Sequence, residues 1–172
     1  MYSLLFWGFI LPIFAFPVAG IALIPALGYA MIAFAAWRLG AYSPPFRVVA
    51  AAALILTVLV LPTPYLPKIV YTSGAFGITS LLVQCLLGWS VLSCVARDCE
   101  THGHIDVAAA ARWRRIAYVV IMIAVPAVVM CLPARFVDTA SPSLLLLPVA
   151  TLLVAYVLLV WTVQTAKIRL FP

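Results

Sequence analysis

The chain has little charge, and that charge is absent from five long stretches. Only 14 of its 172 residues are Lys, Arg, Asp or Glu, whereas 67% are apolar. None of these four residue types, and no His, occurs within residues 1–37, 48–67, 69–96, 116–134 or 139–166. Because a helix needs about 20 apolar residues to cross a bilayer, the pattern predicts an all-α integral membrane protein. The gaps between the stretches are too short for a separate soluble domain.

The same absence excludes several kinds of chemistry. Ionisable groups inside a membrane mark ion paths, proton relays and catalytic sites, and these stretches contain none. A haem held between helices would need histidine on the spans, but His102 and His104 both lie in a gap. The four cysteines form no C-x-x-C motif, which argues against disulfide exchange. The net charge of +6 is explained by basic residues beside the spans, so no nucleic-acid partner is expected.

We expect one membrane domain over residues 1–172, a bundle of about five transmembrane helices. The expected spans are 20–37, 47–66, 75–96, 116–134 and 144–166. The first uncharged stretch is too long for one upright helix, and Pro17 and Gly20 favour a break within it. Either residues 3–16 form a half-crossing or interfacial helix before the first span, or the two parts form a hairpin of two spans. Met1-Tyr2-Ser3 lacks the basic residues of a secretory signal, so we expect this segment in the mature protein.

Lysine and arginine set the expected orientation. The gaps 38–47 and 97–115 and the C-terminal tail carry eight of these residues, and the opposite side carries only Lys68 and Arg135. The positive-inside rule then places loop 97–115 and the C-terminus in the cytoplasm. The N-terminus is outside if the first stretch crosses once and inside if it forms a hairpin. We expect an integral protein of a bacterial inner (cytoplasmic) membrane.

Loop 97–115 and its border hold the one cluster of metal-ligand types. Cys94, Cys99, His102 and His104 have the spacing C-x4-C-x2-H-x-H, which departs from the C-x2-C form common in zinc sites. The alternative is a solvated turn, in which one helix ends at Gly103 and Asp106 caps a helix that continues into the fourth span. We therefore predict no metal and no cofactor, with these four residues as weak metal candidates.

Four arginines of the same loop form the second candidate site. Arg97, Arg112, Arg114 and Arg115 are expected near the lipid headgroups, where a basic residue gains about 1 kcal/mol from anionic lipid. They are candidates for contact with lipid or with a partner protein, beside their role as topology anchors.

Polar uncharged side chains gather in the third span. Thr79, Ser80, Gln84 and Ser90 form the predicted polar span face, suited either to hydrogen bonds between helices or to the wall of a solute path. This span is therefore expected to be the central, protein-buried helix.

Two classes of function remain open. The first is a non-catalytic accessory, anchor or assembly subunit of a larger membrane complex, because the spans hold no charge and the loops are short. The second is a small-solute transporter or channel component that uses the polar span face. A membrane enzyme or metal site in loop 97–115 is a further alternative. The expected partners are the lipid bilayer and other membrane subunits or further copies of the chain.

Overall fold

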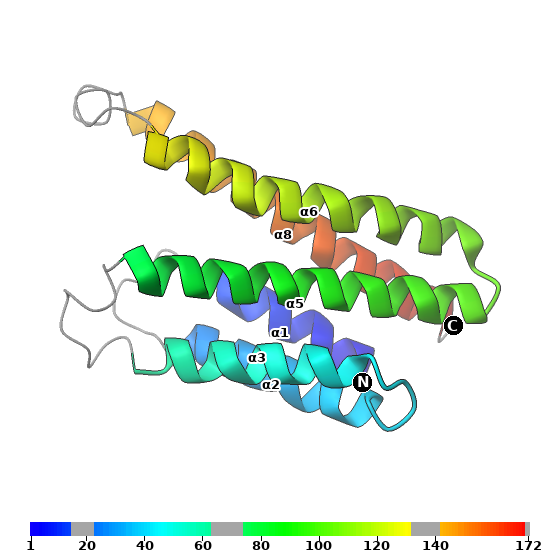
Figure 1. Ribbon diagram of the computed structural model, residues 1–172. Helices are drawn as coiled ribbons and strands as arrows, with labels where there is room; N and C mark the ends of the chain where they lie inside the picture. Colours follow the sequence, from blue (N-terminus) through cyan, green and yellow to red (C-terminus); the bar gives the residue numbers. More distant parts are fainter. Residues whose placement is uncertain (15–22, 63–73, 132–141, 171–172) are drawn as a thin grey trace.

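The computed structural model describes residues 1–14, 23–62, 74–131 and 142–170. Within these residues the protein has six helices and no strand (Figure 1). The helices are α1 (Tyr2–Phe14), α2 (Leu23–Leu39), α3 (Phe46–Val60), α5 (Gly74–Thr101), α6 (Ile105–Cys131) and α8 (Pro142–Leu170). The all-α prediction is confirmed.

Five of the helices form a closed ring of neighbours. α1 packs on α2, α2 on α3, α3 on α5, α5 on α8, and α8 on α1, while α6 lies against α5 and α8. Figure 1 shows that the start of α1, the turns at 40–45 and 102–104, and the end of α8 all lie at one end of the bundle. We call this the charged end, because every charged side chain of the described residues lies in the half of its helix nearer to it.

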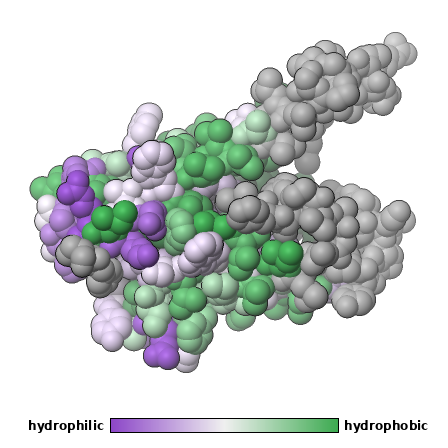
Figure 2. Space-filling model, turned by 180° about the vertical axis from the view of Figure 1, so that it is seen from behind, coloured by the Kyte–Doolittle hydropathy of each residue, from purple (hydrophilic) through white to green (hydrophobic). Residues whose placement is uncertain are grey.

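Away from the charged end the surface is apolar. Large side chains such as Val58, Leu82 and Val120 are between 58 and 65% exposed, and Figure 2 shows the hydrophilic colours gathered towards one end of the visible face. Among the described residues, two segments are long and apolar enough to cross a membrane, Ala75–Thr101 and Ala150–Leu170. α1, α2 and α3 are apolar but shorter.

The first uncharged stretch folds as two antiparallel helices, α1 and α2 (Figure 1). A Cβ atom added at Gly8 would lie 2.9 Å from the carbonyl oxygen of Gly28, and one at Gly28 would lie 2.7 Å from that of Gly8. The two backbones therefore touch, and neither position has room for a larger side chain. Both alternatives, a half-crossing helix before the first span and a hairpin of two spans, place two helices in this stretch, so the number of crossings stays a prediction. The predicted break from Pro17 to Gly20 lies outside the described residues.

The stretch 97–115 is mostly helical rather than a loop. α5 continues to Thr101 and α6 begins at Ile105, so three residues connect them. As predicted, one helix continues from this turn into the fourth expected span. The prediction that Asp106 caps it is wrong, because the helix begins at Ile105 and Asp106 lies in its first turn. α6 also contains Pro126 within its length.

The prediction that the third span is the central, protein-buried helix is wrong in part. α5 packs against α3, α6 and α8, yet Ile78, Leu82, Leu86 and Trp89 on it are between 40 and 59% exposed. Because α5 is a member of a ring, it buries only its inner side.

Candidate functional site

A pocket of about 580 Å³ lies at the charged end, and we call it the end pocket. It is lined by Met1, Tyr2, Leu39, Tyr42, Ser43, Phe46, Arg97, Asp98, Thr101, His102 and Leu170. Two of the residues predicted from sequence, Arg97 and His102, therefore share a pocket with side chains from α1, the turn 40–45 and α8. The pocket thus brings polar groups from α5 and the turn 40–45 together with the start of α1.

Tyr2 joins two parts of the end pocket. Its hydroxyl donates a hydrogen bond to Asp98 Oδ2 at 2.7 Å, and its ring meets the ring of Phe46 edge-on at 6.3 Å. Tyr2 precedes the predicted segment 3–16 and is 3% exposed. The bond ties α1 to α5.

The turn between α5 and α6 is held by hydrogen bonds from its own residues. Gly103 has a φ of 80°, a left-handed conformation that favours glycine. The His104 N–H donates to the Cys99 carbonyl at 2.8 Å and the Gly103 N–H to that of Glu100 at 3.1 Å, the pattern of a helix-ending Schellman motif. The helix end predicted at Gly103 is confirmed.

His102 takes part in the same helix end. Its Nδ1 lies 2.8 Å from the Asp98 carbonyl oxygen, which can only accept a hydrogen bond, so Nδ1 is the donor. The Thr101 hydroxyl donates to the same oxygen at 2.8 Å. These bonds satisfy the Asp98 carbonyl in the last turn of α5. The ring of His102 therefore stabilises the end of this helix.

The four metal candidates do not converge. Among the described residues, no three His, Cys, Asp or Glu side chains are grouped so that they could hold a metal ion. Cys94 and Cys99 are buried, whereas His102 is exposed.

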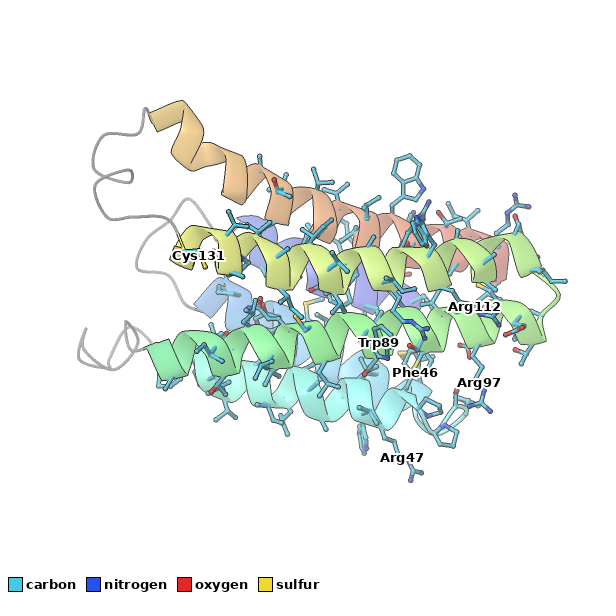
Figure 3. All side chains as sticks on the ribbon, turned by 45° about the horizontal axis from the view of Figure 1, so that its top comes forward. Phe46, Arg47, Trp89, Arg97, Arg112 and Cys131 are labelled. Atoms are coloured by element: carbon cyan, nitrogen blue, oxygen red, sulfur yellow. The ribbon has the colours of Figure 1, made fainter. Side chains whose placement is uncertain are left out.

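Three of the four candidate arginines interact within the bundle. Arg112 pairs with Glu100 in an exposed salt bridge, and Arg114 donates to the Thr162 hydroxyl of α8 at 3.0 Å. The remaining contacts belong to Arg115. It donates from Nη1 to the Ser93 hydroxyl at 3.0 Å, and its guanidinium lies 4.0 Å from the centre of the Trp89 ring. Arg97 is exposed and lines the end pocket. Figure 3 labels Trp89 and Arg97 on α5 and Arg112 on α6.

The predicted polar span face does not form a single surface. Thr79 is exposed and returns its hydroxyl to the Ala75 carbonyl of its own helix at 2.8 Å. Ser80 and Gln84 are half-buried, and Ser90 is buried. These four side chains therefore differ in exposure, and a shared role for them stays a prediction.

Sequence reasoning missed a group of three tyrosines inside the bundle. The hydroxyl groups of Tyr29 and Tyr156 lie 3.3 Å apart, and the rings of Tyr118 and Tyr156 meet at 6.3 Å. The Tyr118 ring lies over Gly88, where an added Cβ atom would come within 2.1 Å of Cε1. These tyrosines come from α2, α6 and α8, so only the tertiary fold brings them together. The available signal was the place of Tyr29 and Tyr156 near the middle of predicted spans, whereas Tyr118 lies near the start of its span.

Sequence reasoning also missed a second pocket, of about 730 Å³, between α2 and α3. Arg38 and Arg47 line it together with apolar side chains. The signal in the sequence was a pair of basic residues on either side of the turn Ser43-Pro44-Pro45.

Comparison with known proteins assigns this chain to no family. The chain matches no protein-family model, no curated protein and no solved structure. The function must therefore be argued from the described residues themselves.

Proposed function

We propose that this protein is an integral membrane bundle that serves as a non-catalytic accessory, anchor or assembly subunit of a larger membrane complex. The observation that carries the proposal is the separation of polar and apolar surfaces. The described charges lie towards one end, and the remaining surface exposes large apolar side chains on several helices. In water, such a surface would be an aggregation hazard, whereas lipid or an apolar partner would cover it.

Helix lengths support a membrane location. The apolar segment of α5 has 27 residues, about 40 Å of helix, compared with roughly 30 Å of hydrocarbon. Its last turns would then lie beyond the hydrocarbon, together with Asp98 and Glu100. α1 and α3 have 13 and 15 residues, about 20–23 Å. Local thinning of the bilayer would accommodate these shorter helices.

The charge distribution supports a cytoplasmic charged end. Eight lysine and arginine residues belong to this end, and Lys68 and Arg135 belong to the opposite side in the sequence. With α1 and α2 as a hairpin, the chain would cross six times in an inner membrane, once more than the five predicted spans. Both the start of α1 and the end of α8 would then face the cytoplasm.

The bonding of polar groups supports a non-catalytic role. In the end pocket, the Asp98 carboxylate accepts a hydrogen bond from Tyr2, and the His102 ring donates one to the Asp98 carbonyl. Both groups therefore have structural partners, which argues against a role as general acid or base. Inside the bundle, Leu87, Val91 and Leu159 are at most 1% exposed. A packed interior of this kind suits a scaffold better than a solute path.

Purification in a mild detergent tests the subunit proposal. The proposal predicts that other membrane polypeptides remain with the protein in a fixed ratio through affinity and size-exclusion steps. A lone, monodisperse species would contradict it. Flux of small solutes or ions into liposomes that hold only this protein, lost on Gln84→Leu, would instead support the transport alternative.

A further inference from the structure

The pocket between α2 and α3 combines two positive charges with an apolar wall. Arg38 comes from the last turn of α2, and Arg47 comes from the first turn of α3. The lining also includes Phe34, Trp37 and Ala50, and Trp37 is 67% exposed. We call this pocket the arginine groove. Figure 3 shows Arg47 extending outward from the bundle.

Neither arginine of the groove is neutralised within the described residues. The only salt bridge that those residues form joins Arg112 to Glu100, and neither Arg38 nor Arg47 forms a side-chain hydrogen bond there. Asp98 is already the acceptor for Tyr2. Two arginines beside one apolar pocket are therefore left without an anion.

The groove holds its arginines in place through apolar contacts. The Arg38 guanidinium lies 5.5 Å from the centre of the Phe34 ring, within reach of a cation–π interaction. The stem of Arg47 lies against the backbone at Gly40, where an added Cβ atom would be 3.0 Å from its Cγ. A larger residue at position 40 would therefore displace Arg47 without changing the net charge.

We propose that the arginine groove binds an anionic phospholipid, with its phosphate between Arg38 and Arg47 and an acyl chain against Phe34 and Ala50. Arginine pairs bind phosphate oxygens well because guanidinium groups offer several donors in a fixed plane. Basic pockets between helices on the cytoplasmic side suit anionic headgroups. This inference rests on the proposed membrane location, since only a membrane supplies headgroup and chain together.

Tryptophan quenching by brominated lipid tests the site. The wild-type protein is reconstituted in phosphatidylcholine vesicles, and brominated phosphatidylglycerol or brominated phosphatidylcholine is titrated in. Trp37 lines the groove, so we expect stronger quenching by the anionic lipid, and we expect Trp37→Phe to remove that excess. The double variant Arg38→Gln/Arg47→Gln should weaken the preference about ten- to thirty-fold.

Matched variants distinguish a defined site from general attraction. Lys167→Gln/Arg169→Gln removes the same charge from the last turn of α8 and should retain the preference. Gly40→Val retains the charge and should weaken the preference. An equal loss in both double variants would overturn the site in favour of diffuse attraction, and competition by inorganic phosphate at equal concentration would show that the groove binds phosphate rather than lipid.

Flotation of the vesicles distinguishes a failure of the arginine groove from a failure of the proposed membrane location. Protein that floats with the vesicles but shows no preference for anionic lipid overturns the arginine groove alone. Wild-type protein that does not float with the vesicles overturns both the membrane location and the groove.

Discussion

The two helical hairpins that turn at the charged end use their arginines differently. In the α5–α6 hairpin, Arg112 and Arg115 bond to side chains of α5. In the α2–α3 hairpin, Arg38 and Arg47 have no acidic partner among the described residues. The α5–α6 hairpin carries four arginines and three acidic residues, whereas the α2–α3 hairpin carries two arginines and no acidic residue. The first hairpin uses arginines for internal bonds, and the second leaves its arginines available. Charge that is already bonded contributes to stability, and charge that is not bonded can bind a ligand.

The largest expected effect lies in the packing of the α5–α6 hairpin. Gly88→Leu should destabilise the bundle by about 3 kcal/mol, because even a Cβ atom there would overlap the buried Tyr118 ring. Denaturation in mixed micelles, followed by circular dichroism, measures this change. Gly77→Ala on the same helix is the control, since nothing lies within 4 Å of its added Cβ atom. It should be neutral or stabilising by up to about 1 kcal/mol, and a similar loss in both variants would contradict the packing.

A second variant tests the bonded arginine of α6. Arg115→Ala should cost about 2 kcal/mol, since it removes a charged hydrogen bond to Ser93 and the contact with Trp89. The same denaturation assay measures it. Arg38→Ala in the other hairpin is the comparison and should change stability by less than about 0.5 kcal/mol. Equal costs at the two positions would remove the distinction between the hairpins.

Tyr2 connects the two hairpins, with Phe46 of α3 on one side and Asp98 of α5 on the other. Tyr2→Phe keeps the ring and removes the hydroxyl, so we expect a loss of about 1–1.5 kcal/mol. Tyr42→Phe is the matched control, because Tyr42 lines the same pocket but is 90% exposed. A loss in the control as large as that in Tyr2→Phe would show that the hydrogen bond to Asp98 contributes nothing specific.

The smallest effect is expected for the exposed pair at the charged end. Arg112→Ala should cost less than about 1 kcal/mol, because Arg112 and Glu100 are each about half exposed and water screens such pairs. Whatever difference remains should shrink as salt rises from low to high concentration. A large, salt-independent loss would mean that Arg112 has a structural role beyond this pair.

Local features were predictable from the sequence because their causes are local. The helix end at Gly103 depends on a left-handed glycine. The next helix begins at Ile105, with Asp106 in its first turn. The partners of the arginines were not predictable in this way. Arg114 reaches Thr162, 48 residues away, and Tyr29 meets Tyr156, 127 residues away. Such pairs depend on how helices pack, which a single sequence does not reveal.

The account depends most on the charged end facing the cytoplasm, and labelling with a membrane-impermeant maleimide tests this directly. Tyr42, 90% exposed, marks the charged end, and Cys131, the exposed last residue of α6, marks the opposite end. The account predicts that Cys131 reacts in intact cells. It also predicts that Tyr42→Cys, in a Cys131→Ser background, reacts only after the membrane is opened. Reaction of the position 42 thiol in intact cells would contradict it.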